Sequence, residues 1–301
     1  MENIITVNNL KKSYGKVEAI KGISFKVREG SLFAFLGPNG AGKSTTIDTL
    51  CTLIRCDEGD VEICGYKLGA DDRQIRNNIG VVFQTGVLDG RLTINENLLL
   101  RGAFYGLKRK ELERRISDIA DITGISDILD RKYNKLSGGQ RRRADIARAI
   151  IHAPRILFLD EPTTGLDPKT RQSIWMSISA MQKELGMTVF LTTHYLEEAT
   201  NADDIIILKD GLIAESGNAA SLKAKYTKDF IYLYSENPEL EEYFNKQNRV
   251  FQKSQGSLKV EISDKDDAIK ILNDLREKID DFEVIRGTMD DVFLNIIEGV
   301  E

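Results

Sequence analysis

One glycine-rich segment near the start of the chain has the residue types and spacing needed to bind a nucleoside triphosphate. Its residues are Gly37, Pro38, Asn39, Gly40, Ala41, Gly42, Lys43, Ser44 and Thr45. The segment follows a short apolar run and precedes a helical pattern, which predicts a loop between a buried strand and a helix. Backbone N–H groups of such a loop favour phosphate, Lys43 adds positive charge, and the Ser44 hydroxyl can ligate Mg²⁺. The alternative, an ordinary glycine-rich turn, leaves this strand–lysine–helix context unexplained.

A second loop could also face phosphate. After Leu136 it consists of Ser137, Gly138, Gly139 and Gln140, and an amphipathic helical run follows. This arrangement places a hydroxyl and two glycines at a helix N-terminus. Taken alone, such a segment is more often an ordinary cap or turn.

Two acidic residues stand where a metal-dependent hydrolase would need them. A buried strand is predicted at residues 155–159, and it ends in Asp160 and Glu161. Asp160 would hold Mg²⁺ through the coordination shell of the ion, and Glu161 would polarise the attacking water as a general base. Two carboxylates that merely cap a strand are the alternative, and the phosphate loop upstream favours the catalytic interpretation.

The order of the predicted elements indicates an α/β fold with a helical insert. Apolar runs predict strands in the first ~30 residues and again at residues 155–159, 187–192 and 205–208, with helical patterns between the later ones. This rhythm implies a largely parallel sheet. We expect a nucleotide-binding domain over residues 1–218 with a helical lobe at about 93–150, and a small α/β accessory domain over residues 219–301.

Composition excludes several other classes. With 41% hydrophobic residues the chain can form packed cores, and no apolar run approaches the ~20 residues that cross a bilayer. No secretory signal is evident, so a cytoplasmic protein is expected. The net charge of −5 argues against a nucleic-acid partner, and we interpret the triplet Arg141–Arg143 as a solvated helix face. Three unevenly spaced cysteines predict buried reduced thiols rather than disulfides or a zinc site.

These motifs, in this order and spacing, resemble the ATP-binding-cassette (ABC) family over about residues 1–218. The resemblance implies a P-loop NTPase cassette of the ABC type, with a mixed β-sheet core and a helical lobe, that hydrolyses ATP with Mg²⁺. It also implies two cassettes that face each other head to tail. The signature loop at residues 137–140 of one subunit then completes the P-loop site of the other.

Single positions follow from the same resemblance. Tyr14 is similar to the aromatic residue that stacks on adenine, although a tyrosine near a strand otherwise packs. Gln84 resembles the glutamine that ligates Mg²⁺ together with Ser44 and Asp160. Asp167 resembles the residue that reaches across the dimer. His194 resembles the histidine that contacts the γ-phosphate and joins Lys43 and Glu161 in catalysis, whereas His152 is interpreted as a loop residue.

Further segments are similar to bacterial drug and antibiotic-resistance exporter ATPases of the daunorubicin-resistance type. They lie at residues 92–98, 141–147, 162–168 and 289–294. The expected partners are a second ABC subunit, in a homodimer, and integral membrane permease subunits that hold the protein at the inner face of the cell membrane. The sequence does not indicate which compound is transported.

The resemblance also predicts where a permease docks, at residues 84–106. Val87, Leu88 and Tyr105 are expected to be exposed there, and Leu98 and Phe104 to be buried in the helical lobe. The alternative function is a soluble ABC ATPase acting on nucleic acid or the ribosome. Such proteins resemble two cassettes in one chain or a cassette interrupted by long coiled coils, and this sequence has neither feature.

Overall fold

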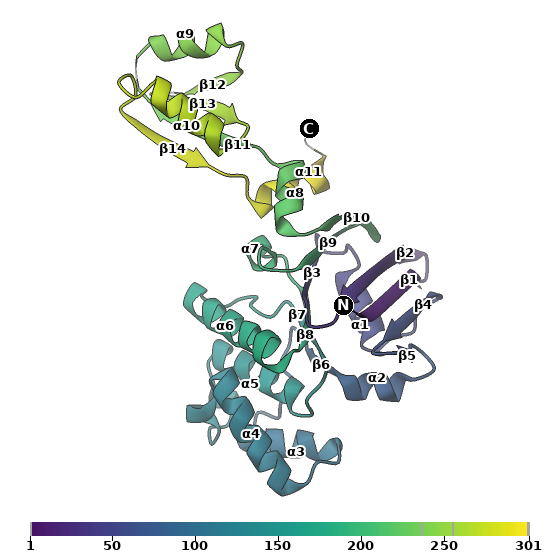
Figure 1. The fold of residues 1–301 in the computed structure, drawn as a ribbon. Coiled ribbons are helices and arrows are strands. Elements are labelled where there is room, and N and C mark those ends of the chain that lie inside the picture. Colours follow the sequence, from purple (N-terminus) through teal and green to yellow (C-terminus); the bar gives the residue numbers. More distant parts are fainter. Residues whose placement is uncertain (1, 236, 255, 300–301) are drawn as a thin grey trace. The chain divides into compact units, whose positions relative to one another are not determined.

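The computed structural model describes residues 2–235, 237–254 and 256–299. The chain folds into two compact units, a larger unit of residues 1–218 and a C-terminal unit of residues 219–301 (Figure 1). Among the described residues, no helix is both long and apolar enough to span a membrane.

A six-stranded sheet forms the centre of the larger unit. In spatial order its strands are β10 (Leu212–Gly217), β9 (Asp204–Lys209), β3 (Leu32–Leu36), β8 (Thr188–Thr192), β7 (Ile156–Asp160) and β6 (Ile79–Val82). All neighbours are parallel except the edge strand β10, which is antiparallel to β9. Every residue of β3 and β8 is buried, as expected for parallel strands covered on both faces. Because parallel strands end at one edge, the residues that follow them are brought together there.

A second, antiparallel sheet completes the mixed β core. Its order is β2 (Val17–Arg28), β1 (Asn3–Tyr14), β4 (Glu58–Ile63) and β5 (Tyr66–Lys67). The alternate residues Ile23, Phe25 and Val27 of β2 are buried, and Phe25 packs against Phe33 and Phe190 of the other sheet, with ring centroids 5.7 and 6.3 Å away. The hydrophobic core between the two sheets therefore fixes the strand that leads into the phosphate loop.

Helices cover the remaining surfaces of the larger unit, and α3 to α6 lie on the opposite side of the six-stranded sheet from the antiparallel sheet (Figure 1). They are α1 (Lys43–Leu50), α2 (Asp72–Asn78), α3 (Ile94–Phe104), α4 (Arg109–Thr123), α5 (Gly138–Ile150), α6 (Pro168–Leu185) and α7 (Leu196–Ala199), with short 3₁₀ turns at Ser126–Ile128 and Tyr133–Lys135. Thr93 and Glu96 form the predicted capping box of α3.

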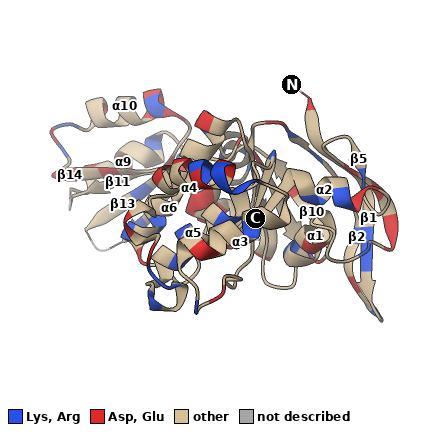
Figure 2. Cartoon of the chain, turned by 90° about the horizontal axis from the view of Figure 1, so that it is seen from below, with Lys and Arg blue, Asp and Glu red and all other residues tan. Residues whose placement is uncertain are grey.

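The outer face of α4 carries charges of both signs (Figure 2). Its arginines pair with carboxylates one turn away, for example Arg109 with Glu113 at 3.0 Å and Arg115 with Glu111 at 2.8 Å. Exposed pairs of this kind contribute only ~0.3–0.5 kcal/mol each and mainly keep the helix soluble.

The C-terminal unit has its own sheet and core. The sheet order is β12 (Phe251–Ser254), β13 (Ser257–Ile262), β11 (Asp229–Tyr234) and β14 (Asp281–Ile285), all antiparallel. The helices are α8 (Ala219–Tyr226), α9 (Glu239–Lys246), α10 (Lys265–Asp274) and α11 (Met289–Glu298). Ile231 and Leu233 of β11 pack with Leu240 and Phe244 of α9 in a core of this unit's own.

Several short elements were not predicted from the sequence. In the C-terminal unit these are α8, α9 and β12, and in the larger unit the segment of α2, β4 and β5 together with the edge strand β10. The β12 sequence Phe-Gln-Lys-Ser is mostly exposed and has almost no apolar alternation, so pairing with β13 rather than its own pattern makes it a strand. The cysteines are free, as expected, but only Cys51 is fully buried.

Candidate active site

The phosphate loop lies between β3 and α1, as predicted. Gly42 has a φ of 105°, and a Cβ atom there would lie 2.6 Å from the Ala19 carbonyl oxygen, so only glycine fits. Lys43 Nζ donates to the carbonyl oxygens of Gly37, at 2.6 Å, and Pro38, at 3.1 Å. Burial lowers the pKa of the Lys43 ammonium, and the Glu161 and Asp160 carboxylates oppose this effect. The loop thus holds the Lys43 ammonium group against its own backbone carbonyl oxygens.

Asp160 and Glu161 follow the carboxyl end of β7. Thr192, at the end of the neighbouring strand β8, donates its hydroxyl to Asp160 Oδ1 at 2.6 Å. The Glu161 N–H donates to the Thr192 carbonyl oxygen at 3.1 Å. Glu161 has a φ of 45°, a left-handed conformation that costs a non-glycine residue ~1–2 kcal/mol.

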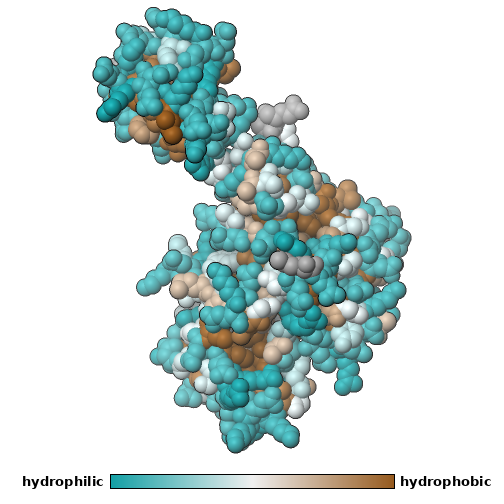
Figure 3. Space-filling model, viewed as in Figure 1, coloured by the Kyte–Doolittle hydropathy of each residue, from teal (hydrophilic) through white to brown (hydrophobic). Residues whose placement is uncertain are grey.

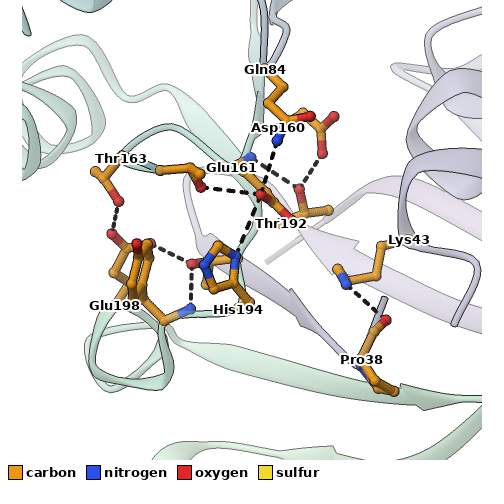
Figure 4. Close-up of polar contacts among 12 residues, drawn as sticks. Pro38, Lys43, Gln84, Asp160, Glu161, Thr163, Thr192, His194 and Glu198 are labelled. Atoms are coloured by element: carbon orange, nitrogen blue, oxygen red, sulfur yellow. Dashed lines mark hydrogen bonds and ion pairs between the residues drawn. The ribbon is translucent and has the colours of Figure 1, made fainter. Parts of the chain in front are cut away.

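The Glu161 carboxylate contacts residues that follow the neighbouring strands β6 and β8, and one residue of its own turn (Figure 4). Its Oε2 accepts from Gln84 Nε2 at 3.4 Å and from Thr164 Oγ1 at 3.1 Å. The same oxygen lies 3.4 Å from Nδ1 of His194, whose side chain is 40% exposed. Gln84 and His194, which were predicted separately, therefore both lie within reach of the Glu161 carboxylate.

The donor set fits a magnesium ion. No group of three or more His, Cys, Asp or Glu side chains gathers anywhere in the described ranges. Mg²⁺ usually takes one or two protein oxygens and completes its shell with water and phosphate. Ser44 is exposed in the first turn of α1, and Asp160 is half-buried with Oδ1 occupied by Thr192, which leaves Oδ2 for a cation. Together with the Gln84 amide oxygen these are hard oxygen donors of the required kind.

The signature loop and Asp167 both cap helices. Ser137 accepts from the Gln140 N–H at 3.3 Å, and the Gln140 side chain accepts from the Ser137 N–H at 3.0 Å, which forms a capping box at the start of α5. Asp167 accepts from Thr170 N at 3.0 Å and from its hydroxyl at 2.5 Å, and these bonds lower the pKa of the aspartate. Tyr14 is 51% exposed at the end of β1, available for stacking.

The interpretation of Arg141–Arg143 as a solvated face is wrong for Arg142. This side chain is 7% exposed and points from α5 to the strand ends, where it donates to three backbone carbonyl oxygens. The sequence offers only a weak indication of this burial. Arg142 and Asp145 are three residues apart, between Gly139 and Ala149 on one face of the helix, and opposite charges at that spacing can share a buried face.

Glu198 is a second residue that the sequence analysis missed. Its carboxylate is 4% exposed and accepts from the hydroxyls of Thr163 and Thr193, the latter at 2.6 Å (Figure 4). Thr163 stands two residues after Glu161, and Thr193 immediately precedes His194. Glu198 therefore links the segments that carry these two candidate catalytic residues.

The predicted docking segment is only partly as expected. Val87 and Tyr105 are exposed, by 37% and 44%, and Leu98 is buried. The prediction for Leu88 is wrong, because this residue is 7% exposed. The prediction for Phe104 is also wrong, since it is 71% exposed at the end of α3.

Comparisons with known proteins identify the family of this chain. A family model described as ABC transporter matches residues 20–164, and one described as ATP-binding protein DrrA1-3-like, C-terminal domain, matches residues 217–297. The doxorubicin resistance ATP-binding protein DrrA of Mycobacterium tuberculosis is 42% identical over 222 residues, covering 73% of this chain and 67% of that protein. The linearmycin resistance ATP-binding protein LnrL of Bacillus subtilis is 38% identical over 229 residues, covering 76% of this chain and 73% of that protein.

Solved structures lead to the same class. A dimeric ATP-binding cassette in a post-hydrolysis state bound to ADP and Pi has 32% sequence identity and a TM-score of 0.65, over 71% of this chain and 98% of that one. The chain belongs to the ABC family as an ATP-binding subunit of a transporter. The predicted cassette fold and the predicted resemblance to drug-resistance ATPases are confirmed, and ATP hydrolysis coupled to transport is the activity of this class.

Proposed function

We propose that this protein powers an exporter of drugs, antibiotics or lipid-like compounds. The relatives named above are doxorubicin and linearmycin resistance ATP-binding proteins, and others are Nod factor export ATP-binding proteins. The match of residues 217–297 to the C-terminal domain of DrrA-type proteins supports the same branch. Selectivity would reside in permease subunits, as expected from the sequence.

The observation that carries the catalytic assignment is the contact of Gln84 and His194 with one oxygen of Glu161. Glu161 would accept the proton of the attacking water, and His194 would orient its carboxylate and contact the γ-phosphate. Lys43 would compensate phosphate charge inside the loop, and Tyr14 would stack on adenine. Ser44, Gln84 and Asp160 would hold Mg²⁺, which neutralises charge that develops on the phosphate oxygens.

The active assembly would be a head-to-tail homodimer. Ser137 and its glycines form a helix N-terminus suited to phosphate, and the similar cassette bound to ADP and Pi is dimeric. Each signature loop would complete the site on the partner's phosphate loop, and Asp167 would reach across between them. Closing and opening of this dimer would drive the permease between its two accessible states.

A permease would hold the protein at the inner face of the membrane. The surface for it would consist of four exposed large apolar residues: Val87 in the loop before α3, Leu100 and Phe104 on α3, and Tyr105 directly after it. Arg101 on α3 donates to the Val87 carbonyl oxygen at 3.0 Å, so the loop and the helix form one surface. The hydropathy view shows apolar residues exposed on the helical side of the larger unit (Figure 3).

Glu161→Gln tests the catalytic assignment. The substitution should keep ATP affinity within about twofold and lower kcat by at least about a hundredfold, because the amide cannot take the proton. Binding is measured by equilibrium dialysis and hydrolysis by phosphate release. Glu197→Gln is the matched control, an exposed glutamate whose loss should leave both quantities unchanged. Wild-type turnover in Glu161→Gln would remove Glu161 as the base.

A further inference from the structure

Arg142 lies on α5, five residues after Ser137, and is buried although it carries a full charge. Burial lowers the pKa of its guanidinium, and the Asp145 carboxylate opposes that effect. Asp145 in turn accepts from the Tyr133 hydroxyl at 2.8 Å. A charge held in the interior in this way needs hydrogen-bond partners, and the partners of Arg142 lie next to the active site.

The three nitrogens of Arg142 contact three different carbonyl oxygens. Nε donates to Pro162 O at 2.6 Å, and Nη2 donates to Asp160 O at 2.9 Å. Nη1 donates to Phe83 O. Asp160 and Pro162 are the residues on either side of Glu161, and Phe83 immediately precedes Gln84.

The backbone between two of these carbonyls is the left-handed turn at Glu161, whose φ is 45°. Such a conformation persists in a non-glycine residue only where surrounding contacts fix it. A planar guanidinium suits this purpose, because its donors have a rigid geometry and cannot follow the carbonyls into another arrangement. A lysine ammonium, a single point with three rotatable donors, has no such fixed geometry.

We propose that Arg142 is a positioning residue that fixes the backbone on both sides of Glu161 and before Gln84, and so sets the distance between those two side chains. The same side chain joins the helix that begins at the signature loop to the ends of β6 and β7. A shift of α5 would therefore move Glu161 and Gln84 of the same subunit. This inference rests on the proposed role of Glu161 as the base.

Arg142→Lys and Arg142→Gln test the proposal in the full-length protein. Both should lower kcat for ATP hydrolysis by about ten- to a hundredfold and leave the dissociation constant for ATP within about twofold, because the phosphate loop does not depend on these contacts. Arg148→Lys is the matched control. Arg148 lies on the same helix, and its guanidinium donates to Val81 O at 2.6 Å, inside β6 and away from Glu161. The Arg148→Lys variant should lose thermal stability as the Arg142 variants do, while its kcat stays within about threefold of the wild-type value.

The outcomes separate this proposal from the one on which it rests. Inactive Glu161→Gln protein together with near-normal kcat in both Arg142 variants would overturn the role of Arg142 alone, whereas active Glu161→Gln protein would overturn both. A parallel loss of ATP affinity and kcat in the Arg142 variants, or an equal loss of kcat in Arg148→Lys, would show a general packing effect and overturn the proposal. Failure of both Arg142 variants to fold would overturn it too, because the arginine would then serve the fold as a whole.

Discussion

Removing the Glu198 carboxylate should destabilise the larger unit and slow ATP hydrolysis without weakening ATP binding. Thr163 and Thr193 are 0% and 1% exposed, so neither hydroxyl can turn to bulk water when its acceptor is lost. A hydrogen bond to a charged group contributes ~1.5–3 kcal/mol, and two are lost in Glu198→Ala. Water that enters the cavity left by the side chain offsets some of this loss of stability. We expect the free energy of unfolding to fall by about 3 kcal/mol.

Glu198→Gln should cost less, about 1 kcal/mol, because the amide keeps the shape and one acceptor oxygen. The Thr193 hydroxyl also accepts from the Tyr195 N–H at 2.9 Å, so loss of its acceptor should loosen the turn at His194. Urea unfolding followed by circular dichroism measures stability, and phosphate release measures kcat. Glu197→Ala, an exposed neighbour on α7, is the control.

A double-mutant cycle sharpens this test. Thr163→Val and Thr193→Val each remove one donor to the same carboxylate, so their effects on kcat should not be additive. The reasoning would be refuted if Glu198→Ala unfolded within about 0.5 kcal/mol of wild type and retained wild-type kcat, a difference typical of ordinary surface substitutions.

Two further predictions concern the dimer and pH. Ser137→Arg should abolish hydrolysis while the monomer still binds ATP, since the side chain would fill the space where the partner's γ-phosphate is expected. Normal ATP-dependent dimerisation of this variant, measured by gel filtration, would contradict the head-to-tail arrangement. His152 should make the free energy of unfolding fall at acidic pH. Burial, with Arg148 and Arg115 nearby, lowers the pKa of His152 from 6.5 to about 4. Between pH 6.5 and pH 4 the unfolded chain therefore binds the proton more readily than the folded chain. The contribution of His152 to the free energy of unfolding should therefore be complete above pH 6.5 and lower by about 2 kcal/mol at pH 5. In His152→Gln, the amide can replace the ring N–H that donates to Ile79 O at 3.0 Å, so this variant should lack that pH dependence in urea titrations. An equal dependence of stability on pH in the variant and the wild type would exclude this role of His152.

The phosphate loop and the acidic strand end could be predicted because their signals are local. A glycine loop between a buried strand and a helix, and carboxylates directly after another strand, can be recognised within a few neighbouring residues. Their meeting at one sheet edge follows from parallel pairing of β3, β8 and β7. Gln84, Glu161 and His194 follow β6, β7 and β8, and these strands are parallel neighbours, so the three residues meet at the same edge.

Arg142, Glu198 and Leu88 could not be placed in this way, because their environment is made by distant segments. Arg142 contacts carbonyls 18 to 59 residues away in the chain. Glu198 accepts from Thr163, 35 residues earlier. Residue type alone predicts exposure for a charged side chain, and only tertiary contacts reverse that expectation. Leu88 was predicted to be exposed and is buried for a similar reason, since the burial of an apolar loop residue depends on which distant segments pack over it.

The capping box at Ser137 has a consequence for how two copies would meet. Its hydroxyl oxygen already accepts the Gln140 N–H, and the Gln140 side chain is held by the Ser137 N–H, so both rotamers are fixed in the separate chain. Ordering a free side chain during association costs ~0.5–1.5 kcal/mol. Here that entropy is lost when the chain folds, and it does not have to be lost again on encounter. The hydroxyl proton, which the backbone does not use, remains free to donate outward to an incoming anion.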